Sequence, residues 1–212
     1  MEEYKTLRAP ASDEFTEKRS RFIGYAQPVS TQVEAAAFIE RIKKQHHDAT
    51  HNVFAYLLRE GQLERYSDDG EPQGTAGIPV LDVLRKQGVT NCAVVVTRYF
   101  GGILLGAGGL VRAYSHAAAI ALGKAGIVTM AHCAILDIAC DYSFYGKLAV
   151  CIPEWGGIVE DTQFGGAVTV RVRIHATLVD SFCAKLTDAS NGRFQAVQTG
   201  DCLLYTSPSP RD

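Results

Sequence analysis

The chain has 212 residues, of which 47% are hydrophobic and 21% are charged, and its formal net charge at pH 7 is −2. This length accommodates one large or two small domains, and the composition is typical of a globular protein. The net charge excludes a protein that is strongly basic throughout, although a local basic patch remains compatible with it. No apolar run reaches membrane-spanning length and the N-terminus lacks the apolar core of a signal peptide, so we expect a cytoplasmic protein without membrane contact.

The cysteines agree with that compartment. None of them forms a C-x-x-C pair, and most stand in apolar patterns typical of a strand or helix. We therefore expect buried free thiols rather than disulfides or metal ligands, as in a reducing environment. The cysteines are Cys92, Cys133, Cys140, Cys151, Cys183 and Cys202.

The first part of the chain, residues 1–126, predicts strands and helices in alternation after a polar leader. Thr31 and Glu34 form a T-x-x-E capping box, and apolar residues recur behind it with helical spacing. Gly88 predicts the end of a second helix, and Gly126 the end of a third helix and of the domain. Strands are expected at residues 21–29, 52–60, 63–66 and 92–96, and helices around residues 31–42, 80–87 and 110–122.

The second part, residues 127–201, predicts the order βαββαβ, which is the ferredoxin-like pattern. Asp141 is the expected N-cap of its first helix, and Gly165 with Gly166 predicts a two-residue hairpin turn. The fold class predicted for the whole chain is therefore α+β. Strands are expected at residues 130–140, 158–164, 167–176 and 194–199, and helices at residues 144–155 and 179–186.

The last eleven residues, CLLYTSPSPRD at 202–212, differ in character from everything before them. A common transposase adapter of sequencing libraries encodes this segment without a mismatch, so we interpret it as a read-through tail. The alternative is a native disordered end rich in Pro and Ser. In either case we leave the segment out of the expected fold and expect no function from it.

A glycine-rich segment, TRYFGGILLGAGGL at residues 97–110, follows the buried strand. The strand ends with Arg98 and Tyr99, and glycines including Gly101 and Gly102 precede the next helix. Backbone N–H groups at such a helix start can hold an anion, and Arg98 together with Arg112 can add contacts to a phosphate. The spacing matches neither a Walker motif nor a dinucleotide fingerprint, so a glycine-packed turn without a ligand is the alternative.

A second loop, SDDGEPQGTAG at residues 67–77, contains three carboxylates, those of Asp68, Asp69 and Glu71. Clustered carboxylates can bind Mg²⁺ or perform acid–base catalysis, but the spacing of an EF-hand is absent. Asp-Gly and Glu-Pro also form turns, which favours a solvated acidic loop over a catalytic one. Gly74 and Thr75 are expected to belong to the same site, with Thr75 as a candidate cap of the next helix.

The histidines His46, His47 and His51 lie close together in the sequence. Zinc requires three or four ligands, and no cysteine stands nearby, so structural or surface roles are favoured and no metal site is predicted. His51, at the start of a strand, is expected to point toward the glycine-containing loops.

The strand VTVRVRIHA, residues 168–176, alternates strictly between apolar and polar residues. Its polar face contains Arg171 and Arg173, and a basic sheet face can contact a nucleic-acid backbone. The stacking aromatic residues of an RNA-recognition motif are missing, which favours an ordinary solvated face.

Two of these motifs, SDDGEPQGTAGIP and VVVTRYFGGILLGAGGLVRAY, closely resemble the signature of the IMPACT (YigZ) family. The segments EKRSRFI and HHDATHNVFAY are similar to the N-terminal pattern of that family, and the resemblance extends from Lys18 to about Thr199. Where the family often has a basic residue, this chain has Thr50. The positions that match the motif are Asp68, Asp69, Glu71, Gly74, Thr75, Gly77, Arg98, Tyr99, Gly101, Gly102, Gly106, Gly109 and Tyr114.

The resemblance implies a first domain like the second domain of a small-subunit ribosomal protein, which is an α/β sandwich. It implies a second domain similar to a late domain of elongation factor G. Eukaryotic relatives regulate translation by competing for the activator of a stress kinase, a circuit that bacteria lack. The resemblance brings no established catalytic residue and no cofactor.

We therefore predict a non-enzymatic, translation-associated regulatory protein that binds RNA, the ribosome or a translation factor. Its groove would lie between the two glycine-containing loops, with Arg98 and Arg112 at the phosphate and with Arg171 and Arg173 on a second docking face. One alternative is an enzyme that acts on a small phosphorylated or acidic substrate, with Asp68 or Asp69 as base or metal ligand. Another is a pure protein-interaction domain. The sequence predicts no particular oligomeric state.

Overall fold

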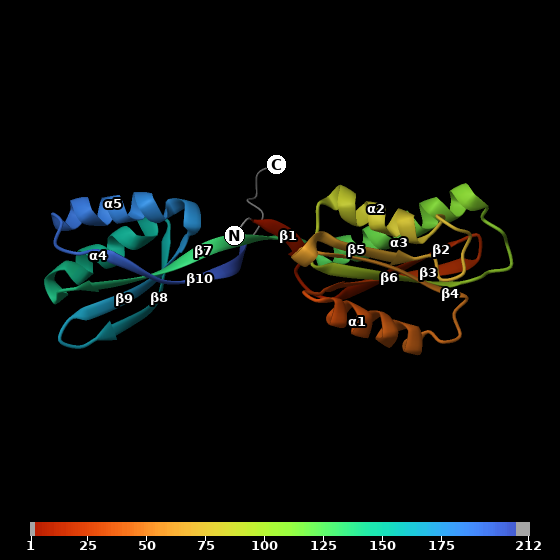
Figure 1. Ribbon diagram of the computed structural model, residues 1–212, viewed down its shortest axis with the longest axis horizontal. Coiled ribbons are helices and arrows are strands. Elements are labelled where there is room, and N and C mark those ends of the chain that lie inside the picture. The colour runs from red at the N-terminus through yellow and green to blue at the C-terminus, as the bar shows by residue number, and fades with distance from the viewer. Residues whose placement is uncertain (1–2, 207–212) are drawn as a thin grey trace. The chain divides into compact units, whose positions relative to one another are not determined.

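The computed structural model describes residues 3–206, which form two compact units: residues 4–129, and residues 130–206 together with Glu3. Both units combine helices with strands, so the predicted α+β class is confirmed (Figure 1). The division falls inside a strand rather than at Gly126. Across residues 3–206, no helix has both the length and the apolar character needed to cross a membrane.

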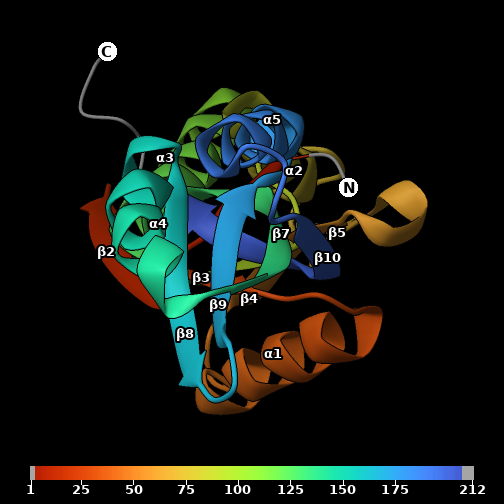
Figure 2. The ribbon, with the colours of Figure 1, turned by 90° about the vertical axis from the view of Figure 1, so that its left-hand side faces the viewer.

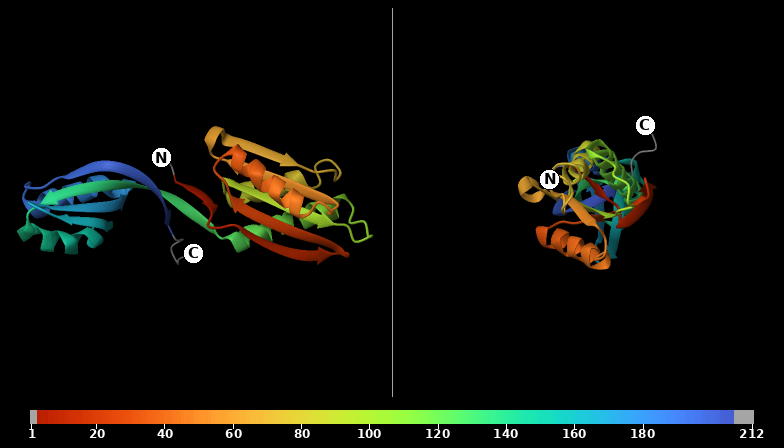
Figure 3. Two further views of the ribbon diagram at one scale, coloured as in Figure 1. Left: turned by 90° about the horizontal axis from the view of Figure 1, so that it is seen from below. Right: turned by 90° about the vertical axis from the view of Figure 1, so that its right-hand side faces the viewer.

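The first unit is built on an antiparallel sheet with the strand order β2-β3-β6-β4-β5. Helix α1 covers one face of this sheet, and α2 and α3 cover the other (Figures 1 and 3). This arrangement is the expected α/β sandwich. The elements are β1 (Tyr4–Leu7), β2 (Ala11–Glu17), β3 (Ser20–Pro28), α1 (Gln32–Gln45), β4 (His51–Leu58), η1 (Glu60–Gln62), β5 (Leu63–Ser67), α2 (Gly77–Gln87), β6 (Cys92–Tyr99) and α3 (Ala107–Ala125).

The central strand β6 is buried on both faces, as its continuous apolar sequence predicts. Its even-numbered apolar residues belong to the core beneath α2 and α3, whereas Ala93 and Val95 belong to the core beneath α1. Side chains alternate along a strand, so Arg98 lies on the face covered by α2 and α3. Tyr99 consequently lies on the opposite face.

The helix ends of the first unit follow the local sequence. The Oγ1 atom of Thr31 accepts a hydrogen bond from the Glu34 N–H at 3.2 Å, and the Glu34 carboxylate accepts one from the Ser30 N–H at 2.7 Å. The predicted capping box of α1 is thus confirmed, with its return bond at the residue before the cap. Gly88 ends α2 with a φ of 65°, the left-handed conformation for which glycine is preferred.

The prediction of a polar leader at the N-terminus is wrong, because these residues form β1 and β2. Strand β1 is held by hydrogen bonds from the Thr90 N–H to the Lys5 carbonyl at 2.8 Å and from Thr6 Oγ1 to the Asn91 carbonyl at 3.1 Å. Strand β2 pairs with β3 at the edge of the sheet and turns Phe15 toward the core. An edge strand in which only Ala11 and Phe15 pack against the core gives little periodic signal, which explains why the sequence pattern missed it.

The second unit has the predicted βαββαβ order. Strand β9 lies between β7 and β8, and β10 pairs with β7. Helices α4 and α5 pack on one face of the sheet, where alternate residues of β9 from Val168 to Ile174 form the core with them (Figure 2). Asp141 caps α4 as predicted, accepting from the Phe144 N–H at 2.8 Å. The elements are β7 (Ile127–Cys140), α4 (Tyr142–Glu154), β8 (Gly157–Phe164), β9 (Val168–His175), η2 (Ala176–Leu178), α5 (Val179–Ser190) and β10 (Ala196–Thr206).

Two details of the second unit differ from the sequence prediction. Phe164 pairs with Val168, so the β8–β9 turn contains three residues, 165–167, instead of two. Strand β10 continues to Thr206, so residues 202–206 of the segment that we left out of the fold belong to a strand. Residues 207–212 lie outside the described residues, and the origin of the tail stays a prediction.

The six cysteines are free thiols in the structure, and three of them, Cys92, Cys133 and Cys140, are buried. Burial inside the first unit raises the pKa of the Cys92 thiol to about 12. This thiol is therefore protonated and unreactive near neutral pH.

Candidate functional site

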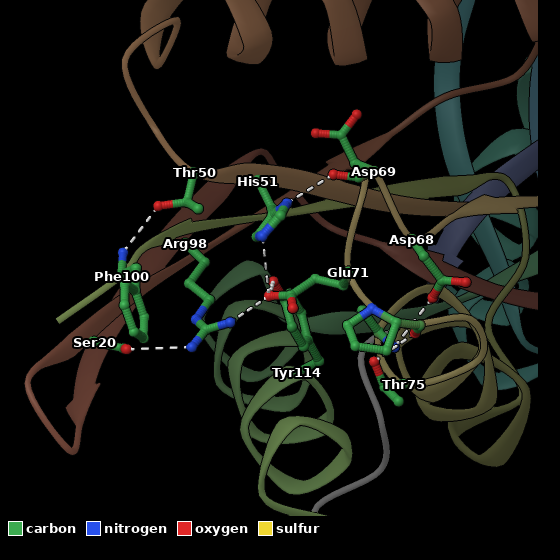
Figure 4. Close-up of polar contacts among 12 residues, drawn as sticks. Ser20, Thr50, His51, Asp68, Asp69, Glu71, Thr75, Arg98, Phe100 and Tyr114 are labelled. Atoms are coloured by element: carbon green, nitrogen blue, oxygen red, sulfur yellow. Dashed lines mark hydrogen bonds and ion pairs between the residues drawn. The ribbon is translucent and has the colours of Figure 1, made fainter. Parts of the chain in front are cut away.

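The centre of the site is an ion pair between the end of β6 and the loop that connects β5 with α2. Arg98 Nη1 donates to Glu71 Oε1 at 2.5 Å, and the two residues are only 5% and 8% exposed (Figure 4). A buried charge without a partner is strongly unfavourable, so each of these groups depends on the other. The two glycine-containing loops therefore meet in space, as the sequence led us to expect.

Tyr114 of α3 is a second partner of the same carboxylate. Its hydroxyl donates to Glu71 Oε1 at 2.8 Å, and its ring lies edge-on to Phe22 with the centroids 5.3 Å apart. Burial, together with the negative charge of Glu71, raises the pKa of Tyr114 above its ordinary value. The phenol consequently stays protonated and acts as a donor. The sequence placed Tyr114 on a helix face and in the family motif but did not reveal this bond.

His51 completes the polar cluster and points toward the glycine-containing loops, as predicted. Its Nδ1 lies 2.8 Å from the carbonyl oxygen of Asp69, and its Nε2 lies 3.8 Å from Glu71 Oε1 (Figure 4). A carbonyl oxygen can only accept, so we assign the proton to Nδ1. This leaves Nε2 facing the carboxylate.

The rest of the Arg98 guanidinium is enclosed by uncharged groups. Nη2 lies 3.4 Å from Ser20 Oγ, and the guanidinium carbon lies 5.5 Å from the centre of the Phe22 ring and 5.4 Å from that of Phe100. The Nε atom is buried and has no hydrogen-bond partner within the described part of the chain. Among residues 3–206, the one carboxylate that pairs with Arg98 is therefore that of Glu71.

A cleft of about 390 Å³ adjoins this ion pair, and we call it the Arg98 cleft. Thr50, His51, Glu71 and Arg98 form its polar side. The glycine-rich segment forms an apolar side in which Leu104 is 82% exposed and Phe100 is 45% exposed. The cleft thus combines a charge-balanced interior with an apolar rim that is open to solvent.

The Asp68 carboxylate does not line the Arg98 cleft but binds backbone N–H groups. It accepts from the N–H groups of Gly74 at 2.9 Å, Ala76 at 3.1 Å and Gly77 at 2.8 Å, and so satisfies free donors at the start of α2. The prediction that Thr75 caps this helix is wrong, because its hydroxyl donates to the Pro72 carbonyl at 2.6 Å. Asp68, not Thr75, is the capping residue.

The Asp69 carboxylate is likewise engaged away from the cleft. It accepts from the Asn52 N–H at 2.7 Å and from Lys43 Nζ at 3.2 Å. Neither Asp68 nor Asp69 is part of the cleft lining. Among residues 3–206, no group of three or more His, Cys, Asp or Glu side chains is arranged to hold a metal ion.

Two further candidates lie outside the Arg98 cleft, so grouping them with Arg98 in one groove is wrong. The Tyr99 hydroxyl lies on the α1 face of the sheet, 2.8 Å from His46 Nδ1 and 3.1 Å from Asp48 Oδ1. Neighbouring side chains of a strand point to opposite faces of the sheet, so Tyr99 and Arg98 lie on different faces. Arg112 is exposed on α3 and lines a different cleft, beside Lys18.

Gly101 and Gly102 are each required by the local backbone, for different reasons. A Cβ on Gly101 would lie 2.0 Å from the carbonyl carbon of Arg19, so the β2–β3 turn approaches this position too closely for a side chain. Gly102 has a φ of 80°, a conformation that other residues rarely adopt. Both glycines support the alternative interpretation of a closely packed turn between strand and helix.

In the second unit, Arg171 and Arg173 lie on the exposed sheet face as predicted, but both are paired. Arg171 donates to both oxygens of Asp137 at 2.8 Å, and Arg173 Nη1 donates to Glu160 at 2.9 Å. The face is therefore balanced in charge rather than basic.

Comparison with known proteins shows the family. Residues 18–122 match the model described as Impact N-terminal domain, and residues 138–193 match a domain of unknown function, DUF1949. "IMPACT family member YvyE" of Bacillus subtilis is 37% identical over 194 residues, which cover 91% of this chain and 89% of that protein. The chain belongs to the IMPACT family. "IMPACT family member YigZ" of Escherichia coli is 34% identical over 92% of this chain and 97% of its own length.

A solved structure described as "Crystal structure of an hypothetical protein" is 33% identical, with a TM-score of 0.60, and covers 94% of this chain and 98% of its own. The match confirms that the two-domain α+β fold occurs in related proteins. In this IMPACT-family chain, the family motif supplies both halves of the Arg98–Glu71 pair and the Tyr114 hydroxyl that joins it.

Proposed function

We propose that this protein acts in translation as a binding protein and that the Arg98 cleft receives an apolar segment of a protein, either a translation factor or a ribosomal protein. Membership of the IMPACT family supports the link to translation, since its eukaryotic members are translation regulators. The cleft supports the choice of a protein as the partner.

The observation that carries this choice is the internal neutralisation of Arg98. A site for RNA phosphate needs a cation whose charge is available, and Arg98 is already paired with Glu71 at 2.5 Å. The rim of the Arg98 cleft instead exposes Phe100 and Leu104. Exposed apolar groups around a concave surface are typical of a protein-interaction site.

The second unit fits the same interpretation. Arg171 and Arg173 are paired with carboxylates, so its open sheet face presents both charges in alternation. Such a face suits a folded protein partner that has the complementary charge pattern. It is less suited to a polyanion, which requires an excess of positive charge. We therefore propose this face as a second contact with the translation machinery.

The alternative is an enzyme that acts on a small phosphorylated or acidic substrate. Asp68 and Asp69 would need to face the cleft to act as base or metal ligand, yet both hold backbone N–H groups. The cleft lining contains His51 beside the Arg98–Glu71 ion pair. The enzymatic function would therefore rest on His51, and loss of a measured turnover in His51→Gln would support it.

Co-sedimentation with purified ribosomes through a sucrose cushion tests the proposal. Ribosomes are used before and after the high-salt wash that strips bound factors. Binding to washed particles that is lost in Leu104→Asp indicates a ribosomal protein, and binding to unwashed particles alone indicates a factor. Leu104→Asp should abolish binding. Val33→Asp, at a position 78% exposed on α1, is the matched control and should bind normally. Equal binding by both variants, or no binding by the intact protein to either preparation, would refute the proposal.

A further inference from the structure

A second cleft in the first unit, of about 310 Å³, lies between the β2–β3 turn and α3, and we call it the Arg112 cleft. It shares Leu105 with the Arg98 cleft but is otherwise lined by different residues. Three basic side chains line it, those of Lys18, Arg112 and His116, against one acidic side chain, that of Glu17. The two clefts therefore differ in chemistry: one has a balanced charge and an apolar rim, and the other is basic.

The two cations of the Arg112 cleft, Lys18 and Arg112, outnumber its one carboxylate, that of Glu17. In the part of the chain that the structure describes, neither Lys18 nor Arg112 makes an ion pair or a side-chain hydrogen bond. Other arginines of this unit are paired, Arg21 with Glu14 and Arg85 with Glu64. Unpaired cations that converge on a concave surface concentrate the positive potential there and attract anions.

Helix α3 forms one wall of the same cleft, and its first turn contains no acidic residue. Gly109 brings this turn into the cleft lining, while Arg112 and His116, four residues apart, lie on the same helix face.

The opposite wall is fixed in position. Ser20 Oγ accepts from the Gly101 N–H at 3.2 Å, which ties the β2–β3 turn to the glycine-rich segment. The ring of His116 lies edge-on to that of Phe15, with the centroids 4.6 Å apart. These contacts hold the β2–β3 turn beside the glycine-rich segment and β2 beside α3, so the elements that carry Lys18 and Arg112 need little rearrangement before a ligand binds.

We propose that the Arg112 cleft binds a phosphoryl group, contributed by the backbone of an RNA strand or by a nucleoside monophosphate. A guanidinium matches two phosphate oxygens, and an ammonium adds a point charge. This site goes beyond the proposed function, because it uses none of the apolar rim around Leu104.

An NMR titration of the ¹⁵N-labelled full chain tests the proposal, with inorganic phosphate, adenosine monophosphate and a short single-stranded RNA as probes at low salt. Saturable shifts are expected at the amides of Lys18, Gly109 and Arg112. The double variant Lys18→Gln/Arg112→Gln should bind at least about tenfold more weakly, since it loses two charge-assisted contacts. Lys44→Gln/Lys86→Gln removes the same charge from exposed positions on α1 and α2 and should bind normally. A thermal unfolding midpoint close to that of the intact protein confirms the fold of both variants.

The probes also separate the two sources of the phosphoryl group. Comparable affinity for adenosine monophosphate and RNA supports a mononucleotide, whereas much tighter RNA binding that added phosphate displaces supports an RNA strand. Equal weakening in both double variants would show nonspecific attraction and overturn the proposal, as would the absence of shifts with all three probes. Leu104→Asp should leave the shifts intact, so failure of the protein-docking proposal does not entail failure of this one.

Discussion

Arg98 and Glu71 lie 27 residues apart in the sequence and meet at 2.5 Å inside the first unit, where both are almost completely buried. Their contact joins the glycine-rich segment to the loop before α2. It also shows that two residues of the family motif form a buried ion pair in which their charges neutralise each other. The motif therefore has a structural role, since it forms the wall of a cleft, in addition to any role in binding a ligand.

Arg98→Met should destabilise the first unit strongly, because it leaves the Glu71 carboxylate buried without its cation. A loss of about 3–5 kcal/mol in the free energy of unfolding is expected, measured by urea denaturation. The double variant Arg98→Met/Glu71→Gln should recover part of this loss, since it removes both charges.

The matched control for this prediction is Arg21→Met, which breaks an ion pair with Glu14 whose side chains are about half exposed. Its cost should stay below about 1 kcal/mol, because water screens exposed pairs. Similar losses for Arg98→Met and Arg21→Met would contradict the assignment of Arg98 as a buried partner.

Asp68→Ala should destabilise the protein by about 1–2 kcal/mol, since it removes the side-chain acceptor at the start of α2. The direct readout is amide hydrogen exchange, which should become faster at Ala76 and Gly77. Thr75→Val is the control, because its hydroxyl bonds to the Pro72 carbonyl and not to these amides. Faster exchange at Ala76 and Gly77 in Thr75→Val alone would show that Thr75 is the cap, as the sequence suggested.

Gly101→Ala should lower the free energy of unfolding by at least about 1–3 kcal/mol, because the new methyl group would overlap the backbone of Arg19. Gly123→Ala provides the opposite case, at an exposed position in α3 where an added Cβ meets no atom within 4 Å. It should raise stability by about 0.5–1 kcal/mol. Both values come from thermal or urea unfolding, and a neutral Gly101→Ala would show that the turn moves freely.

The sequence predicted elements well where the periodicity was strong, and less well where position depended on distant residues. The T-x-x-E box at Thr31 and the cap at Asp141 are local signals, and both are confirmed. The meeting of the two loops followed from the family motif. The partner of Arg98 could not be read from the sequence, because Glu71, Asp68 and Asp69 are equivalent acidic residues until the fold orients them.

The separation of Tyr99 from Arg98 could have been anticipated, because neighbouring residues of a strand face opposite sides of a sheet. Placing Arg112 required the position of α3 relative to the β2–β3 turn, which only the tertiary structure defines. The same holds for Lys18, whose role beside Arg112 gave no signal in the local sequence.

His46 should make stability depend on pH. Tyr99 donates its hydroxyl hydrogen to Asp48 and therefore accepts from His46 Nδ1 at 2.8 Å, which leaves Nε2 to accept from the Tyr25 hydroxyl at 2.6 Å. This pattern requires a neutral imidazole. Burial lowers the pKa of His46 below its ordinary value of 6.5, against an opposing effect of the Asp48 charge and with a further lowering by the Arg21 charge.

Because the pKa of His46 is lower in the folded state than in the unfolded state, the unfolded chain binds the proton more readily. The stabilising contribution of neutral His46 is therefore complete above about pH 6.5 and is lost as the pH falls through the lowered value. Urea unfolding between pH 7.5 and about pH 5 should show a decline that is smaller in His46→Gln. The exposed neighbour His47 is the control, and His47→Gln should follow the intact protein. A decline of the same size in His46→Gln would exclude His46 as its origin.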